Sequence, residues 1–248
     1  MKVYIDAGHG GKDSGAVKYL REKDVNLTMA LACRDYLKLY GVETKMSRTK
    51  DVNTNLNQLC ADCNKWGADY AISCHNNAGG GDGFEVFHTI FGGVAKTLAK
   101  NIETEVKKLG QNSRGLKTKR STTFVGKDYF GFNRMIKCPA VICEGVFVDN
   151  SKDVKIADTK AEQRAFGYAY AKGVLRTAGV PIKVVYETQS DLNLRNQPNL
   201  DNSDVLVVVP EGTVLTGSEL AKGWLKTTYK GKKGYVRIKG QKTYCKKV

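Results

Sequence analysis

Apolar residues follow two different patterns along the first 178 residues. Short apolar runs of strand length, such as KVYIDAG and PAVICEGVF, alternate with longer segments in which every third or fourth residue is apolar. The first pattern is typical of strands buried on both faces of a sheet, and the second is typical of amphipathic helices. Strands interleaved with helices predict an α/β fold with a mainly parallel sheet flanked by helices.

The boundaries of these elements follow from turn residues and from the change of period. The predicted strands cover about residues 2–8, 43–48, 70–77, 83–88 and 139–147, and the predicted helices cover about 24–41, 55–66, 94–110 and 161–179. The stretch that ends near Ile136 is basic and irregular, so we expect a loop there.

The pattern changes at Gly179. VPIK indicates a short linker over residues 179–183, and after it the helical period is replaced by short runs rich in Val, Thr, Leu and Tyr between DNSD, EGT and KGKKG. Such runs are typical of a small all-β domain. We therefore expect an α/β domain over 1–178 and a β domain over 184–248.

Composition and charge restrict the classes of partner that the protein is expected to bind. The chain of 248 residues carries a net charge of +15, spread over both predicted domains, which favours a polyanionic partner such as nucleic acid, an anionic lipid surface or an acidic wall polymer. The sequence lacks zinc-finger spacing and RNA-binding signatures, so we expect no nucleic-acid partner. It also lacks an apolar run of about 20 residues, so we expect no membrane insertion.

The N-terminal sequence MKVYIDAGHGG lacks the apolar stretch of a secretory signal, so we expect synthesis in the cytosol without a signal peptide. The seven cysteines lie mostly in apolar segments. Cys60 and Cys63 form a C-x-x-C pair, but their helical spacing and the lack of a second pair predict core thiols rather than a metal or redox pair.

The three histidines are placed unevenly. His9 follows the first strand and His75 ends the third, so in a mainly parallel sheet both lie at the carboxyl edge, where open α/β sheets place their sites. Glu22, at the start of the first helix, would complete a set of two histidines and one glutamate of the kind that binds hydrolytic zinc. Each residue also has a structural alternative, a hydrogen-bonded histidine or a helix N-terminal acid. His88 has no such context and is interpreted as an ordinary strand residue.

Glu144 lies within the apolar strand PAVICEGVF. Burial of a carboxylate is costly unless it is paired or used, and burial raises its pKa, which suits a proton shuttle. A structural salt bridge would satisfy the same burial.

Together these segments resemble the zinc-dependent N-acetylmuramoyl-L-alanine amidases of the amidase 3 type. The resemblance lies in IDAGHGGKDSGA, REKDVNL, ADYAISCHNNA and PAVICEGVFVDN, in this order. Ala7 stands where the family usually has proline, and Cys74 where it usually has isoleucine. Neither difference removes a proposed ligand.

The resemblance implies a function for each of these residues. His9, Glu22 and His75 would bind Zn²⁺, and Glu144 would be the catalytic acid and base. The enzyme would cleave the amide between the lactyl group of N-acetylmuramic acid and L-alanine of the stem peptide, using a zinc-activated water.

A basic loop offers candidate substrate contacts. Arg114 and Lys117, in SRGLKTKR, resemble the family's loop before the last strands and are candidates for binding muropeptide carboxylates, with a solvated loop as the alternative.

The C-terminal part resembles bacterial SH3 domains of cell-wall hydrolases through DLNLRNQPN, KGWLKT and GKKGYV. Trp224 and Tyr235 are expected to be core residues of an SH3-like barrel, with ligand platforms as the alternative. The resemblance implies a cell-wall-binding domain over residues 184–248.

The whole sequence is thus interpreted as a peptidoglycan hydrolase, a phage endolysin or an autolysin, that acts on the cell wall after release. Peptidoglycan is the expected partner, with anionic wall polymers as a second one. Two alternatives stay open: a zinc carboxypeptidase that acts on stem peptides, and a non-catalytic peptidoglycan-binding protein. Retention of His9, Glu22, His75 and Glu144 argues against the second.

Overall fold

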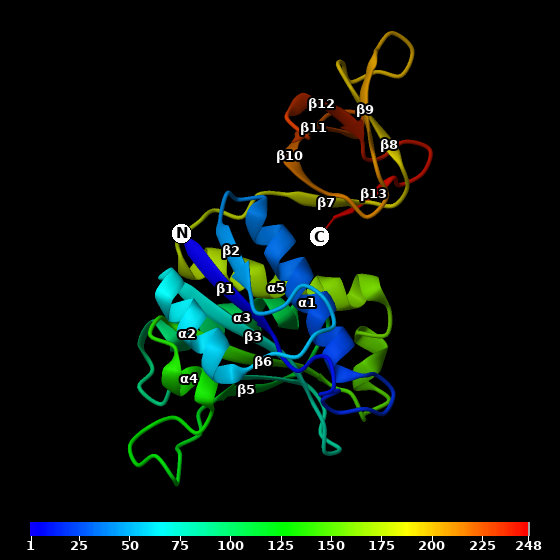
Figure 1. Ribbon diagram of the computed structural model, residues 1–248. Coiled ribbons are helices and arrows are strands. Elements are labelled where there is room, and N and C mark those ends of the chain that lie inside the picture. The colour runs from blue at the N-terminus through cyan, green and yellow to red at the C-terminus, as the bar shows by residue number, and fades with distance from the viewer. Residues whose placement is uncertain (248) are drawn as a thin grey trace. The chain divides into compact units, whose positions relative to one another are not determined.

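The computed structural model describes residues 1–247, which form two compact units divided after Pro181 (Figure 1). The first unit contains a six-stranded sheet in the order β2-β1-β3-β6-β4-β5. Its strands are β1 (Lys2–Ala7), β2 (Glu43–Met46), β3 (Tyr70–Asn77), β4 (Phe84–His88), β5 (Ser113–Lys117) and β6 (Ala140–Phe147).

Strands β2, β1, β3 and β6 are parallel, whereas β4 runs antiparallel to β6 and carries β5 parallel to itself. The predicted α/β class with a mainly parallel sheet is confirmed. The reversal at β4 has a simple cause. Residues 78–83, which connect β3 to β4, are too few to return the chain from the carboxyl end of the strands to their amino end. A parallel strand at this position would require such a return.

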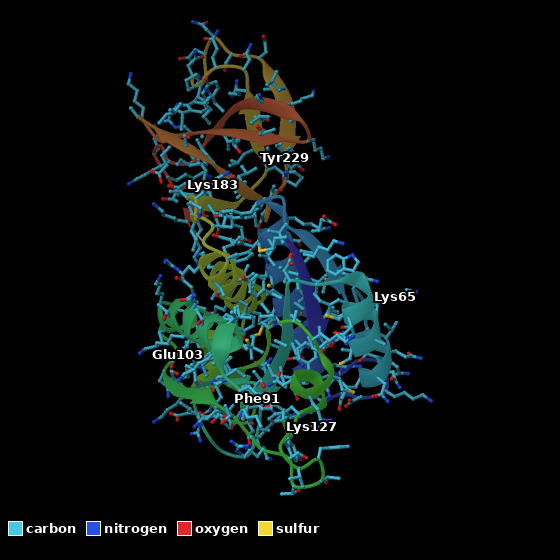
Figure 2. The ribbon with its side chains drawn as sticks, turned by 90° about the vertical axis from the view of Figure 1, so that its left-hand side faces the viewer. Lys65, Phe91, Glu103, Lys127, Lys183 and Tyr229 are labelled. Carbon is cyan, nitrogen blue, oxygen red and sulfur yellow. The ribbon has the colours of Figure 1, made fainter. Side chains whose placement is uncertain are left out.

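Helices cover both faces of this sheet. They are α1 (Glu22–Lys38), α2 (Leu56–Trp66), α3 (Gly93–Lys107), α4 (Gly131–Met135) and α5 (Lys160–Thr177), with a 3-10 turn at Asp153–Ile156. In Figure 2, Glu103 marks α3 and Lys65 marks α2, and the sheet lies between them. Helix α5 packs on both α1 and α3. A Cβ at Gly167 would lie 2.2 Å from the carbonyl oxygen of Met29, so glycine permits the close contact of α5 with α1.

The segment predicted to be irregular contains β5 and α4, so that prediction is wrong there. Strand β5 reads SRGLK and lies at the edge of the sheet, where it pairs with one neighbour and is only partly buried. Helix α4 has five residues, too few to show an apolar period. Neither element therefore produces the apolar periodicity in the sequence on which the prediction of strands and helices depends.

The second unit is an antiparallel seven-stranded sheet in the order β13-β7-β10-β11-β12-β8-β9. Its strands are β7 (Val185–Thr188), β8 (Leu192–Arg195), β9 (Val205–Val209), β10 (Val214–Leu220), β11 (Trp224–Tyr229), β12 (Lys232–Arg237) and β13 (Cys245–Lys247). They enclose a separate apolar core that includes Leu194, Leu215, Leu225 and Val236. Trp224 is buried, as expected of a core residue, whereas Tyr235 is only partly buried.

Six of the seven cysteines are buried, and all seven are free thiols in the structure. Cys60 and Cys63 pack in the core between α2 and the sheet, as predicted. Across residues 1–247, none of the helices combines the length and the apolar character needed to cross a membrane.

Candidate functional site

The turn after β1 has a conformation that its glycines permit. His9 has a φ of 62°, which turns the chain sharply at the carboxyl edge of the sheet. A Cβ at Gly8 would lie 2.3 Å from the ring of His75, and a Cβ at Gly15 would lie 2.5 Å from Oε2 of Glu22. Both glycines are therefore required for the backbone to pass so close to these side chains.

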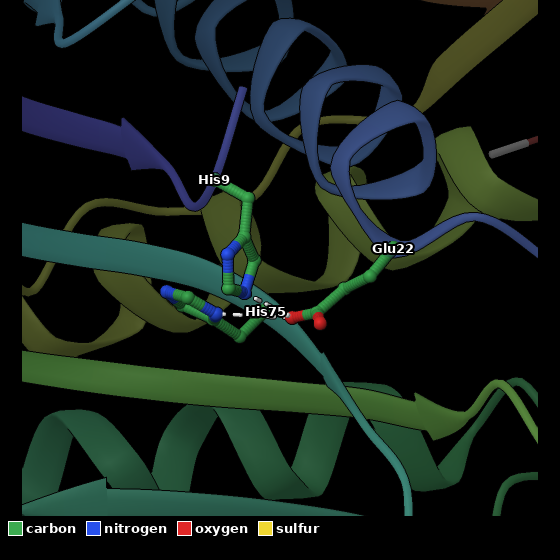
Figure 3. A group of neighbouring side chains, drawn as sticks. All are labelled: His9, Glu22 and His75. Carbon is green, nitrogen blue, oxygen red and sulfur yellow. Dashed lines mark hydrogen bonds and ion pairs between the residues drawn. The ribbon is translucent and has the colours of Figure 1, made fainter. Parts of the chain in front are cut away.

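Three predicted ligands meet at this edge (Figure 3). Oε1 of Glu22 lies 3.1 Å from Nε2 of His9 and 3.0 Å from Nδ1 of His75. One donor atom from each residue lies within 4.8 Å of the others. The side chains come from the turn after β1, the first turn of α1 and β3. The cluster is thus a candidate site for one divalent cation.

Hydrogen bonds orient the ligands. Asp13 Oδ2 lies 2.8 Å from Nδ1 of His9 and favours a proton on Nδ1, which leaves Nε2 available as a ligand atom. Glu22 accepts hydrogen bonds from the backbone N–H of Ala16 at 2.9 Å and of Asn76 at 3.1 Å. The Glu22 carboxylate therefore has a fixed orientation.

The charges in the cluster depend on one another. Burial alone would raise the pKa of Glu22, but hydrogen bonds with His75 and His9 hold it well below its ordinary value. The hydrogen bond with Glu22 raises the pKa of His9 to about 9 against the opposing effect of burial. A carboxylate that holds two imidazoles in this way has the donor set and the negative charge to bind a cation in place of their protons.

Glu144 lies beside the cluster on the same face of the sheet. In the strand register it is the partner of His75 on β3 and of Glu85 on β4. Burial raises the pKa of Glu144 to about 7; His75 opposes the shift, and Glu22 and Glu85 add to it. A carboxyl group that titrates near neutral pH can both accept and return a proton.

Arg114 and Lys117 extend from β5 toward Glu85. Arg114 Nε donates to Glu85 Oε1 at 2.7 Å, and Lys117 Nζ lies 4.0 Å from the same oxygen. The Arg114 guanidinium also lies over the ring of Phe147, 5.3 Å from its centroid. Both predicted substrate-binding residues thus reach, through Glu85, the row of side chains that includes Glu144.

A buried arginine was missed by the sequence analysis. Arg48 donates from Nε to the carbonyl oxygen of Ala7 at 2.8 Å, and from one Nη to those of Gly8 at 3.0 Å and Lys23 at 2.7 Å. One guanidinium therefore fixes the segment before His9 to the segment after Glu22. Its sequence context, MSRTK, carries no sign of burial.

Two buried asparagines, also missed, join the remaining segments. Asn26 Nδ2 donates to the carbonyl oxygen of Gly8 at 3.1 Å, and Asn76 Nδ2 donates to Asn26 Oδ1 at 2.7 Å. The backbone N–H of Val146 donates to Asn76 Oδ1 at 3.0 Å. This chain of hydrogen bonds links the turn that carries His9 to β3 and to β6. For Asn26, the signal in the sequence was a polar residue on the apolar face of a predicted helix.

Comparison with known proteins places the first unit in a family. Residues 3–176 match the family model described as N-acetylmuramoyl-L-alanine amidase. This chain belongs to the N-acetylmuramoyl-L-alanine amidase family. The resemblance identified from the four sequence segments is thereby confirmed, and neither alternative function is favoured by the relatives. Residues 190–240 match the bacterial SH3 domain model.

The amidase unit has relatives of several origins. It is 36% identical over 181 residues to N-acetylmuramoyl-L-alanine amidase CwlM of Bacillus licheniformis, a match that covers 71% of this chain and 68% of the relative. It is 31% identical over 182 residues to the endolysin of Bacillus phage SPP1, covering 69% of this chain and 64% of the endolysin.

Solved structures share the fold of this unit. Cwp6 from Clostridium difficile superposes with a TM-score of 0.68 at 33% identity, and the match covers 71% of this chain but only 29% of Cwp6. The catalytic domain of CwlV, an N-acetylmuramoyl-L-alanine amidase from Bacillus (Paenibacillus) polymyxa, superposes with a TM-score of 0.64 at 27% identity. This match covers 73% of this chain and 99% of the CwlV domain.

Proposed function

We propose that this protein is a zinc-dependent N-acetylmuramoyl-L-alanine amidase that hydrolyses the amide between the lactyl group of N-acetylmuramic acid and L-alanine of the stem peptide. The observation that carries the proposal is the convergence of His9, Glu22 and His75 with Glu144 beside them on the sheet. Two imidazole nitrogens and one carboxylate oxygen are the donor set of hydrolytic zinc sites that keep a fourth position open.

His9, Glu22 and His75 would hold the zinc ion, which would supply Lewis acidity to polarise the amide carbonyl and to lower the pKa of water. Glu144 accepts a proton from the attacking water and returns it to the amide nitrogen as the carbon–nitrogen bond breaks. The products are the lactyl carboxylate and the free amine of L-alanine. A pKa of about 7 fits both directions of proton transfer.

Arg114 and Lys117 are proposed to bind a carboxylate of the stem peptide. Arg114 is held at Nε by Glu85, and its side chain remains 41% exposed. An arginine restrained in this way can bind a carboxylate through its other nitrogens with little loss of conformational entropy.

We propose that the second unit binds the cell wall, with peptidoglycan as its ligand and anionic wall polymers as a further one. The match to a bacterial SH3 domain supports this proposal. Residues 182–248 also contain 12 Lys and Arg against 6 Asp and Glu, and this positive charge favours anionic ligands. We also propose synthesis in the cytosol and action on the wall after release, as an endolysin or autolysin.

The test of the amidase proposal is an end-group analysis of purified cell walls treated with the full chain. We expect free N-terminal L-alanine to accumulate. Its release should stop when a chelator removes the metal and should resume when zinc is added. Release of a C-terminal amino acid would instead show a carboxypeptidase. Wall binding without new end groups would show a binding protein.

A pair of histidine variants tests the metal site. His75→Ala removes a proposed ligand, so we expect bound zinc and activity to fall together. His88→Gln is the matched control, because His88 lies outside the cluster and its Nδ1 lies 2.8 Å from the carbonyl oxygen of its neighbour Thr89. Equal zinc content in both variants would exclude this ligand set.

A further inference from the structure

A pair of cysteines lies away from the proposed active site, at the other end of β6. Cys138 lies two residues before β6 begins, and Cys63 lies in the last turn of α2. Among the cysteines of residues 1–247, Cys138 is the one that is partly exposed, while the other six are buried. The proposed amidase mechanism uses neither thiol.

Hydrogen bonds fix these two segments against each other. Asn64, next to Cys63, donates from Nδ2 to the carbonyl oxygen of Met135 at 2.8 Å and accepts from the backbone N–H of Lys137 at 2.9 Å. Cys138 packs against the apolar cluster that contains Cys63, and the two thiols interact with each other. The two cysteines are therefore neighbours although their segments are far apart in the sequence.

A cavity of about 630 Å³ opens beside Cys138. Lys127, Arg134 and Lys137 contribute basic side chains to its lining, and Phe91 contributes an apolar wall. Phe91 and Lys127 are labelled at the same end of the unit in Figure 2. The lining of the cavity thus combines a cysteine with basic and apolar residues.

One acid also lines the cavity, but its carboxylate is already used. Asp128 is 3% exposed and accepts hydrogen bonds from Thr89 Oγ1 at 2.7 Å and from the backbone N–H of Ile90 at 2.8 Å. The charge that a ligand meets is therefore positive, which favours anionic reagents.

The local electrostatics distinguish Cys138 from the other cysteines. The interaction with Cys63 lowers the pKa of the Cys138 thiol, and the same interaction raises the pKa of the Cys63 thiol. Burial raises the pKa of Cys74 and Cys143 well above the ordinary value. Because the thiolate is the reactive form, Cys138 has the features of a reactive thiol and the buried cysteines do not.

We propose that Cys138 is a site of thiol modification, and that a small anionic disulfide such as oxidised glutathione converts Cys63 and Cys138 into a disulfide. The cavity supplies space and positive charge for the reagent, and the neighbouring Cys63 supplies the second thiol. The proposal is independent of the amidase reaction.

The reaction has two exchange steps. The Cys138 thiolate attacks one sulfur of the glutathione disulfide, forms a mixed disulfide and releases one glutathione thiolate. Cys63 then loses its proton to solvent and attacks the Cys138 sulfur, which releases the second glutathione. Two protein thiols are oxidised, one glutathione disulfide is reduced, and both released thiolates take up protons.

The first test uses the native full chain with zinc bound and the anionic aromatic disulfide 5,5′-dithiobis(2-nitrobenzoate). We expect Cys138 to react at least about tenfold faster than any other cysteine, as read by peptide mass mapping. Lys127→Glu with Lys137→Glu should slow this reagent and leave a neutral methanethiosulfonate unaffected. Labelling of Cys138 no faster than of Cys60 would overturn the proposal.

The second test follows the disulfide itself. After treatment with oxidised glutathione, we expect a peptide that joins Cys63 to Cys138 under non-reducing conditions. In Cys63→Ser a stable glutathione adduct should remain on Cys138, whereas Cys60→Ser, the matched control, should behave as the parent chain. Absence of the cross-linked peptide in the parent chain, or pairing of Cys138 with Cys60, would overturn the proposal.

Discussion

The carboxyl group of Glu144 lies in a row with a histidine on one side and a second acid, Glu85, on the other. Glu144→Gln keeps the shape of the side chain but removes the proton acceptor. We expect turnover to fall by about 10²–10⁴-fold, the range typical of lost acid–base catalysis, while zinc stays bound. Zinc content and turnover on soluble muropeptide are measured on the same preparation.

Two results of that experiment would contradict the assignment. Turnover close to that of the parent chain would exclude Glu144 as the proton shuttle. Loss of zinc would instead make Glu144 a fourth ligand.

Asn76 is the residue through which β3 and β6 are joined behind the ligands. Asn76→Ala leaves Asn26 Oδ1 and the N–H of Val146 without their partner, so we expect a loss of about 2–4 kcal/mol in unfolding free energy. Because Asn76 supports the ligand segments, zinc affinity should also fall by about 10–100-fold. Denaturant unfolding and competitive zinc titration measure the two effects separately.

The matched control is Asn133→Ala in α4, a buried asparagine that donates to the carbonyl oxygen of Phe87 at 3.3 Å. It should lose stability but keep its zinc affinity. Equal loss of zinc affinity in both variants would mean that Asn76 has no specific role in holding the ligands.

The sequence predicted the three clustered residues and Glu144 because each lies at a strand end, in the first turn of a helix or inside an apolar strand. These positions determine where a side chain lies before any contact is known. The supporting residues Arg48, Asn26 and Asn76 depend on which backbone groups the folded chain brings near them. A sequence pattern does not contain that information.

At the scale of elements, Glu105 connects helices α3 and α5. Its carboxylate, 4% exposed, pairs with Lys108, the residue that follows α3, and with Arg176 on α5. Burial alone would raise the pKa of Glu105, but these two hydrogen bonds hold it below its usual value. An acid with a lowered pKa stabilises the fold above the usual pKa, and this contribution is lost as pH falls through the folded-state value.

We expect Glu105→Gln to lower the unfolding free energy at pH 7 by about 1–2 kcal/mol, because Arg176 is partly exposed and solvent weakens the pair. The difference from the parent chain should shrink as the pH falls below the usual glutamate pKa of about 4 and through the lower folded-state value, because Glu105 of the parent chain then takes up a proton and becomes neutral like glutamine. Denaturant titrations at several pH values give this difference. Glu43→Gln, an exposed acid on β2, should show no such trend.

The long elements were predictable because their periods are strong. Strands β3 and β6 and helix α2 lie within about one residue of their predicted bounds. The direction of β4 follows from a short connection and from strand neighbours that the period does not encode. Strand β5 and helix α4 are short and polar, so their stability comes from contacts rather than from local pattern.

At the scale of the whole molecule, each unit has its own core, and all four proposed catalytic and ligand residues lie in the first. We expect residues 1–181 to fold alone and to cleave soluble muropeptide at a rate close to that of the full chain. Activity on intact walls should fall, because two linked binding modules raise apparent affinity on an insoluble polymer. Loss of activity on soluble substrate would show that the second unit contributes to catalysis.

The second unit matches the bacterial SH3 domain model and carries an excess of basic residues. The wall binding that we propose for it should therefore depend partly on salt. The Debye length shrinks from about 10 Å at 0.1 M to about 3 Å at 1 M salt, which weakens attraction to anionic polymers but not shape-specific contacts. We expect residues 182–248 to sediment with purified walls at low salt and less at high salt. Walls stripped of anionic polymers should retain the salt-resistant part. If residues 182–248 stay in solution while residues 1–181 sediment as well as the full chain, wall targeting belongs to the amidase unit.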